Sequence, residues 1–215
     1  MFDDRHDAAI RLSSELGKYR GLNPLVLGIP RGAVPMARVI AGKIVGEVDV
    51  ALARKLGAPG VPEYAIGAVD ETGWSHVAAH AYSAGADAAY LEQETRAQIE
   101  ALRARRIAYT AIRPPTDPQG RIVIVVDDGL ATGATMIAAL HALRARNPAK
   151  LTCAVPIAPP DTIEEVSRYC DEMVCLGAPD NFHSVGQFYR RFEQVSEAEV
   201  VAALKSPHPP PSPLA

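Results

Sequence analysis

Two adjacent carboxylates, Asp127 and Asp128, come directly after a run of apolar residues at 122–126. An ionised carboxylate only accepts hydrogen bonds, so the pair suits sugar hydroxyls or a hard cation such as Mg²⁺. A loop of small residues at 129–135 follows and leads straight into a helical pattern at 136–143. The unpaired N–H groups and the dipole at a helix start favour an anion. These residues therefore predict a phosphate site beside a sugar or metal site, as a phosphorylated sugar requires.

The loop itself offers both backbone and side-chain contacts to a phosphate. Gly133 lets the backbone approach a ligand closely, and the hydroxyls of Thr132 and Thr135 can donate to phosphate oxygens. An ordinary strand–loop–helix with a capping threonine and a solvated acid pair is the simpler interpretation, but capping does not need the acids. Other phosphate motifs fit less well, because Ala134 stands where a Walker lysine would be needed and no G-x-G-x-x-G follows a predicted strand.

The string IVIVV-DD-GL-ATGAT at 122–135 resembles the PRPP-binding motif of the type I phosphoribosyltransferases. The resemblance implies that Asp127 and Asp128 contact the ribose 2′- and 3′-hydroxyls. It also implies that the 5′-phosphate is wrapped by Ala131, Thr132, Gly133, Ala134 and Thr135. The implied activity is transfer of phosphoribose from PRPP to a nucleobase nitrogen with release of pyrophosphate. Mg²⁺ is the implied cofactor, held mainly by the ligand, with the two aspartates as candidate further ligands.

Ala131 fills the position just before Thr-Gly, where 6-oxopurine members of that family carry an aspartate that meets the purine. Here the position is Ala131 and carries no carboxylate, as in adenine- and uracil-type members of the family. The resemblance therefore argues against a hypoxanthine or guanine acceptor, and it leaves the acceptor base otherwise open.

A turn after the first predicted strand, Gly28-Ile-Pro-Arg-Gly32, should reach the same sheet edge as the acids. Arg31 can fork onto phosphate oxygens, and Gly32 allows backbone amides to face a ligand. The plainer interpretation is a strand-to-helix turn with a solvated arginine. The turn is similar to the family's pyrophosphate loop, which implies a catalytic role for Arg31 and predicts a non-proline cis peptide bond near it.

Arg54 and Lys55 close the next predicted strand, where two cations could neutralise pyrophosphate or simply be solvated. The loop at 57–63 lies where the resembled family has a mobile catalytic loop, and its Gly and Pro content fits a lid that excludes water. Glu63 and Tyr64 are further, less specific candidates on this segment.

Residues 177–192 follow the last predicted core strand, at the end where family members bind the base under a hood. Phe182 could stack on a base, and His183 could form a hydrogen bond to it. The alternatives are a core position for Phe182 and an unengaged surface imidazole for His183.

The elements that would position these residues alternate between strand and helix, which favours a parallel sheet with helices on both faces. Strands are expected at 24–29, 48–54, 122–126, 150–156 and 172–176, and helices at 4–18, 34–45, 136–143, 161–168 and 196–204. A hairpin at 64–69 and 75–80 and a long charged helix at 86–111 are additions. The predicted fold is an α/β, three-layer parallel-sheet core like that of the type I phosphoribosyltransferases, with a small hood and an added long helix.

One domain is expected over residues 1–205, with its core at about 20–178 and its hood at about 177–192 together with the N-terminal segment. The tail at 206–215 has five prolines in ten residues and is expected to be disordered. The long helix at 86–111 is either a solvated face with i,i+4 ion pairs or a cover or homodimer element that sends arginines toward phosphate.

Composition narrows the function classes. The chain has 215 residues, of which 48% are hydrophobic, and its formal net charge of −3 disfavours nucleic acid as a partner. Apolar runs fall well short of the roughly 18 residues of a membrane span, and the polar, acidic pattern of residues 1–10 does not predict a signal peptide. The cysteines lack C-x-x-C spacing, which indicates reduced thiols in a cytoplasmic protein and disfavours zinc.

Two other functions compete with catalysis. A regulator that senses PRPP or nucleotides could keep the fold without turnover, although it would need a basic face for nucleic acid. A receiver-like signalling domain would need acids after the first strand, where the chain has Pro30 and Arg31 instead.

Overall fold

The centre of the protein is a five-stranded sheet, seen in a computed structural model that describes residues 1–205. Its order is β2-β1-β6-β7-β8, and every neighbouring pair is parallel. The strands are β1 (Leu25–Gly28), β2 (Glu47–Val50), β6 (Ile122–Val126), β7 (Lys150–Ile157) and β8 (Glu172–Gly177). All of β1 and most of β6 and β7 are buried, as expected for strands covered on both faces. The predicted parallel α/β core is confirmed.

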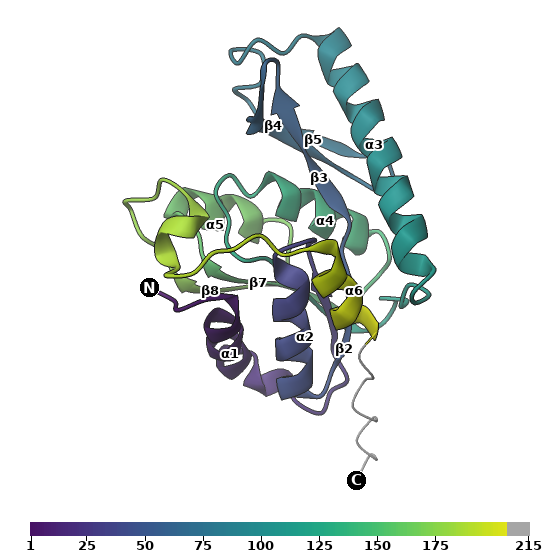
Figure 1. Cartoon of the computed structure of the whole chain (residues 1–215), viewed down its shortest axis with the longest axis vertical. Coiled ribbons are helices and arrows are strands. Elements are labelled where there is room, and N and C mark those ends of the chain that lie inside the picture. Colours follow the sequence, from purple (N-terminus) through teal and green to yellow (C-terminus); the bar gives the residue numbers. More distant parts are fainter. Residues whose placement is uncertain (206–215) are drawn as a thin grey trace.

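Helices cover both faces of this sheet (Figure 1). On one face lie α1 (Arg5–Glu15) and α2 (Ala33–Ile44), whose apolar sides form one core cluster with the sheet. On the other face lie α4 (Ala134–Arg144) and α5 (Pro160–Ser167), which contribute to a second cluster. The predicted three-layer arrangement is therefore confirmed. The short 3₁₀ helices η1 (Gly17–Tyr19) and η2 (Val185–Phe188) and the terminal α6 (Glu197–Lys205) complete this part.

A second unit, here called the arm (residues 53–110), rises from the edge of the core in Figure 1. Its antiparallel sheet has the order β3-β4-β5, formed by β3 (Ala53–Ala58), β4 (Val61–Asp70) and β5 (Ser75–Val77). The long helix α3 (Ala88–Thr110) packs along this sheet, and a third apolar cluster joins both to α2 and α6. The predicted hairpin and the predicted long helix are both confirmed.

The prediction of a loop at 57–63 is wrong, because this segment is largely strand. β3 runs to Ala58 and β4 starts at Val61, so only Pro59 and Gly60 form the turn. Proline followed by a glycine with positive φ (+73° at Gly60) suits a tight type II turn between paired strands. The same glycine and proline content that indicated a long loop therefore specifies a hairpin tip. The predicted strand at 48–54 is also divided, since residues 51–52 separate β2 from β3.

The remaining predicted helices and strands are present, with bounds that shift by a few residues. The predicted proline-rich tail at 206–215 lies outside the described residues. Within residues 1–205, none of the helices combines the length and hydrophobicity needed to cross a lipid bilayer.

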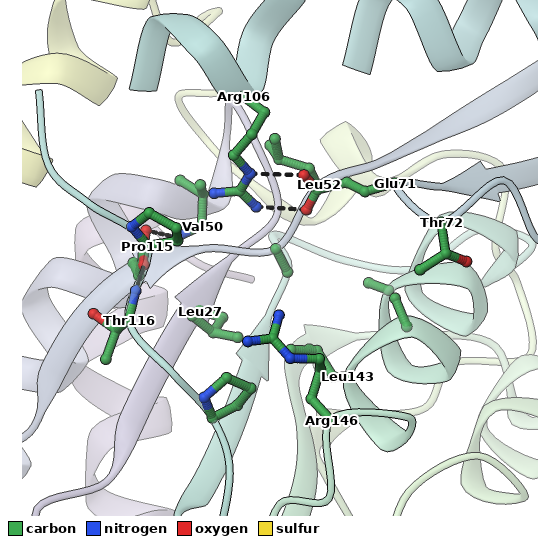
Figure 2. Close-up of a pocket in the computed structure, with 15 residues that line it drawn as sticks. Leu27, Val50, Leu52, Glu71, Thr72, Arg106, Pro115, Thr116, Leu143 and Arg146 are labelled. Atoms are coloured by element: carbon green, nitrogen blue, oxygen red, sulfur yellow. Dashed lines mark hydrogen bonds and ion pairs between the residues drawn. The ribbon is translucent and has the colours of Figure 1, made fainter. Parts of the chain in front are cut away.

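A cavity of about 220 Å³ lies where the arm meets the core (Figure 2). Its core side includes the apolar Leu27 from β1 and Leu143 from α4. On the arm side, Arg106 of α3 makes a two-pronged ion pair with Glu71, with 2.6 Å between Nε and Oε1. This pair joins α3 to the β4–β5 turn directly over the cavity.

The other charged groups at this junction also have partners. Asp49 accepts hydrogen bonds from the backbone N–H groups of Val50 and Thr116, at 2.8 and 2.7 Å. Arg146 pairs with Asp117 at 3.2 Å. Because Arg106 and Arg146 are paired with carboxylates and Asp49 is held by backbone N–H groups, we interpret the cavity as the joint between arm and core. On the neighbouring surface, Trp74 of the β4–β5 turn stacks on His141 of α4, with ring centroids 3.7 Å apart.

The joint makes a testable prediction for Arg106. We expect Arg106→Met to lower the free energy of unfolding by about 1–3 kcal/mol, because Glu71 loses two charge-assisted hydrogen bonds at a partly buried position. The matched control is Arg96→Met on the same helix, whose pair with Glu92 is largely exposed and worth about 0.2–0.5 kcal/mol. Denaturant unfolding followed by the fluorescence of Trp74 measures both, and equal losses would contradict the prediction.

Candidate functional site

The register of β1 against β6 brings the two predicted ligand loops to one edge of the sheet. Gly28 lies opposite Val126, and the Ile29 N–H donates to the Val126 carbonyl at 3.0 Å. The turn that contains Arg31 and the acids Asp127 and Asp128 therefore leave neighbouring strands at the same level. This edge is where open α/β sheets bind ligands.

The two acids are held in a largely buried setting. The Asp128 N–H donates to Asp127 Oδ1 at 2.9 Å, and the Asp128 side chain is only 16% exposed. Burial raises the pKa of Asp127 well above its ordinary value, and the neighbouring Asp128 charge adds to this effect. Burial also raises the pKa of Asp128, but the Arg5 guanidinium opposes the increase. The pair therefore concentrates negative charge at a place where hydroxyl donors or cations would stabilise it.

The phosphate loop begins α4 in the geometry that an anion needs. Gly133 is the N-cap residue with a positive φ of 71°, and no side chain caps the helix. A Cβ at Gly133 would come within 2.6 Å of Val166 Cγ2, so a larger residue would strain both conformation and packing. Thr162 of α5 donates to the Ala131 carbonyl at 2.7 Å and fixes the loop from behind. Uncapped helix N–H groups thus remain for a ligand.

A cavity of about 430 Å³ opens over this loop, within the size range of small-molecule sites. Core, arm and hood segment all contribute to its wall, which consists of Asp127, Gly129, Leu130, Ala131, Thr132, Gly133, Ala134, Thr135, Met136, Lys55, Glu63, Tyr64, Ala65, His183 and Val185. All five predicted phosphate-loop residues therefore face the same space as Asp127. No cluster of three or more His, Cys, Asp or Glu side chains that could hold a metal ion occurs within residues 1–205.

The turn before α2 has the predicted backbone feature, since the Pro30–Arg31 peptide bond is cis. Arg31 is exposed, and its side chain has no hydrogen-bond partner among the described residues. Gly32 lies against the acids, because a Cβ there would come within 2.2 Å of Asp128 Oδ2. The absence of a side chain at Gly32 therefore allows the turn and the acidic motif to lie side by side.

The structure separates Arg54 from Lys55. Both are in β3, and consecutive residues of a strand point to opposite faces. Lys55 lines the cavity and pairs with Glu63 Oε2 at 2.5 Å. Arg54 instead lies near Arg105 and Glu94 of α3, where burial and the Arg105 charge lower its pKa. Of Arg54 and Lys55, both predicted pyrophosphate contacts, only Lys55 lines the cavity over the phosphate loop.

The two candidate acceptor contacts are also divided. His183 lines the cavity, and its backbone N–H is held by Gln187 Oε1 at 2.8 Å. Phe182 packs against the core cluster between the sheet and α1/α2, with its ring 5.3 Å from that of Phe188. In this structure Phe182 therefore has the contacts of a core residue, and Tyr64 supplies an aromatic ring to the cavity instead.

Two residues that touch the acidic motif were not predicted from the sequence. Arg5 of α1 pairs through Nε with Asp128 Oδ2 at 2.8 Å. The Tyr189 hydroxyl donates to the Asp128 carbonyl at 2.6 Å. Arg5 and Tyr189 are 123 and 61 residues from Asp128 along the chain, so no local sequence pattern predicts either contact.

Comparisons with known proteins agree with this geometry. A family model described as "Phosphoribosyl transferase domain" matches residues 3–193. The Mycobacterium tuberculosis proteins named "Putative phosphoribosyl transferase Rv0571c" and "Putative phosphoribosyl transferase MT0597", from two strains, are each 42% identical over 210 residues. These matches cover 97% of this chain and 47% of each relative, so the chain spans about half the length of the curated relatives it matches.

A solved structure extends the likeness to the fold. The crystal structure of TT1426 from Thermus thermophilus is 41% identical in sequence and superposes with a TM-score of 0.78. The match covers 95% of this chain and 97% of that chain, so arm and core are both included.

The burial of Asp127 predicts how stability depends on pH. Folding raises this pKa above 3.8, so the native state binds more protons than the unfolded state and stability falls as the pH rises above about that value. Asparagine keeps an oxygen for the Asp128 N–H without a charge. We therefore expect Asp127→Asn to be more stable than the wild type at pH 7, with the difference vanishing toward acidic pH.

Thermal unfolding of both proteins between about pH 4 and pH 8 measures this difference. Asp117→Asn is the control, since Asp117 is largely exposed beside Arg146 and should give no such gain. Destabilisation by Asp127→Asn at pH 7 would contradict the prediction.

Proposed function

Since the chain belongs to the phosphoribosyl transferase domain family, we propose that it transfers the 5-phosphoribosyl group of PRPP to a nitrogenous base and releases pyrophosphate. One observation supports this most directly. The uncapped helix start at Gly133 and the carboxylate of Asp127 face the same cavity, next to the turn that carries Arg31. A phosphorylated sugar needs this combination of an anion site, hydroxyl acceptors and a nearby cation.

In this proposal, three groups of residues bind three different parts of PRPP, the phosphoribosyl donor. The backbone of 131–135 and the hydroxyls of Thr132 and Thr135 bind the 5′-phosphate. Asp127 and Asp128 accept hydrogen bonds from the ribose hydroxyls. Arg31, on the core turn beside the acids, and Lys55, on the cavity wall formed by the arm, are assigned to the pyrophosphate group.

Mg²⁺ belongs to the proposal, and the donor set fits it. The aspartates offer the oxygen ligands that Mg²⁺ prefers, yet two carboxylates, one already paired with Arg5, leave most of the coordination to phosphate oxygens. When bound, Mg²⁺ would offset negative charge on the pyrophosphate group.

The protein's own charges suit the bond changes. The bond between C1 and the pyrophosphate oxygen breaks, and a C1–N bond forms to the base, which loses a proton. Positive charge develops on the ribose while negative charge grows on the leaving group. In this proposal, Asp127 and Asp128 stabilise the positive charge on the ribose. Arg31 and Lys55 stabilise the negative charge on the pyrophosphate, because these side chains are already near the site before the reaction.

The acceptor pocket is assigned to the part of the cavity between Tyr64 of the arm and His183 of the hood segment. Ala131 provides no carboxylate there, which continues to argue against a 6-oxopurine base. A homodimer and a cytoplasmic location remain part of the proposal. The three cysteines are free thiols in the described structure, in keeping with a reducing compartment.

The proposal is tested by incubating the protein with PRPP, Mg²⁺ and a panel of nucleobases, with pyrophosphate release as the measurement. We expect release with at least one base that is not a 6-oxopurine. Binding of PRPP without turnover on any base would instead indicate a sensor. Failure to bind PRPP would contradict both functions.

A single substitution tests the ribose contacts. Asp128→Asn should weaken PRPP binding by roughly ten- to a hundred-fold, because a charge-assisted hydrogen bond is lost, while the fold stays intact. Titration calorimetry measures the affinity, and thermal unfolding checks the fold. Asp161→Asn, an acid in the first turn of α5, is the control. Unchanged PRPP affinity in Asp128→Asn would remove the ribose role.

A further inference from the structure

Arg5 is fixed on three sides, unlike the exposed arginines of the surface. Its Nε donates to Asp128 Oδ2 at 2.8 Å, and its Nη1 donates to the Glu193 carbonyl at 2.5 Å. The guanidinium lies over the ring of Phe192, 3.8 Å from the centroid. Its side chain is 15% exposed. A guanidinium held by an ion pair, a carbonyl and an aromatic face has little freedom left to lose.

The segment that carries Arg5 is itself tied down. Phe2 exchanges backbone hydrogen bonds with residues 188 and 190, at 2.8 and 2.9 Å, and the Arg191 N–H donates to the Asp3 carbonyl at 3.0 Å. We call these paired residues, 2–5 and 188–193, the terminal clasp. Asp4 caps α1 by accepting from the Asp7 N–H at 3.0 Å. The clasp therefore sets the position of Arg5 before any ligand arrives.

The Asp128 carboxylate is constrained by this arrangement. Oδ2 is occupied by Arg5, while Oδ1 accepts no hydrogen bond from another residue among residues 1–205. The Asp128 carbonyl is held by the Tyr189 hydroxyl, which also belongs to the clasp. One oxygen is thus anchored and the other is left for a donor such as a ribose hydroxyl.

We propose that Arg5 is a positioning residue of the ribose site, which holds Asp128 through Oδ2 and thereby presents Oδ1 to the sugar. The inference rests on the proposed function and adds the N-terminal helix to the donor site. Arg5 need not leave Asp128 for the ligand to bind, because the two contacts use different oxygens. Its fork serves Asp128 and Glu193 together, so lysine can replace only part of it.

Ligand pairs that differ only in the hydroxyls test the role. Affinity is measured by titration calorimetry for D-ribose 5-phosphate and for its 2,3-dideoxy counterpart, in the wild type, Arg5→Met and Arg5→Lys. Arg11→Met is the matched control. Arg11 is on the same helix, pairs with Asp7 and lies near the ring of Phe2, but it does not contact Asp127 or Asp128. Thermal unfolding checks that each variant is folded.

We expect Arg5→Met to weaken ribose 5-phosphate binding by roughly ten-fold or more and to leave binding of the dideoxy ligand unchanged. Arg5→Lys should recover part of the loss, and Arg11→Met should match the wild type. Combining Arg5→Met with Asp128→Asn should weaken binding no further than Asp128→Asn alone, because Arg5 acts through that carboxylate.

Other outcomes overturn the inference in distinguishable ways. Equal losses for the two ligands would give Arg5 a purely structural role, and unchanged or tighter binding of ribose 5-phosphate would show that Arg5 does not support Asp128. If the folded wild type binds neither ligand, the proposed donor site fails and the role of Arg5 fails with it.

Discussion

The parallel pairing of β1 with β6 is the constraint on which the rest of the site depends. Because Gly28 lies opposite Val126, the chain leaves both strands at the same level and the two loops must share one small volume. Gly32 makes this sharing sterically feasible, since any side chain there would collide with the Asp128 carboxylate. A shift of the pairing by one residue would turn the core side chains of the strand to the opposite face of the sheet and would displace Asp127 and Asp128 relative to the neighbouring turn. The hydrophobic pattern that fixes the register therefore also fixes the chemistry.

Placing two adjacent carboxylates at this edge opposes folding, because burial disfavours their charged forms. One cation from the N-terminal end of the chain offsets part of this cost, and one hydroxyl from the C-terminal end holds the backbone beside the acids. Arg5 meets the Asp128 side chain and Tyr189 meets its carbonyl. Both contacts depend on the pairing of residues 2–5 with residues 188–193. The terminal clasp, which joins the two ends of the described chain, therefore also stabilises the buried Asp128.

The sequence predicts correctly those features that are determined by residues close together in the chain. Residues 122–135 contain the strand, the acids, the turn and the helix start in one stretch, so local rules suffice for them. Arg54 and Lys55 were paired in the prediction because the strand was expected to end there; inside β3 they point to opposite faces. The sequence of residues 57–63 predicts a loop where the structure has a hairpin, since Pro59-Gly60 occurs in loops as well as at hairpin tips. Local sequence rules cannot predict the contact of Arg5 with Asp128, because the two residues are 123 positions apart in the chain.

The wall of the cavity over the phosphate loop comes from two sources that differ in how they are supported. Asp127 and the phosphate loop belong to the sheet edge, where backbone hydrogen bonds and two buried clusters fix every position. Lys55 and Tyr64 belong to the arm, which the Arg106–Glu71 pair braces internally and which meets the core through the stacking of Trp74 against His141. Under the proposed function, the contacts to the sugar phosphate come from the core fold, whereas the arm and hood segment add Lys55 for pyrophosphate and Tyr64 and His183 for the acceptor base. If the chain has the proposed activity, such a division would allow the acceptor base to change through the arm and hood while the donor chemistry stays the same.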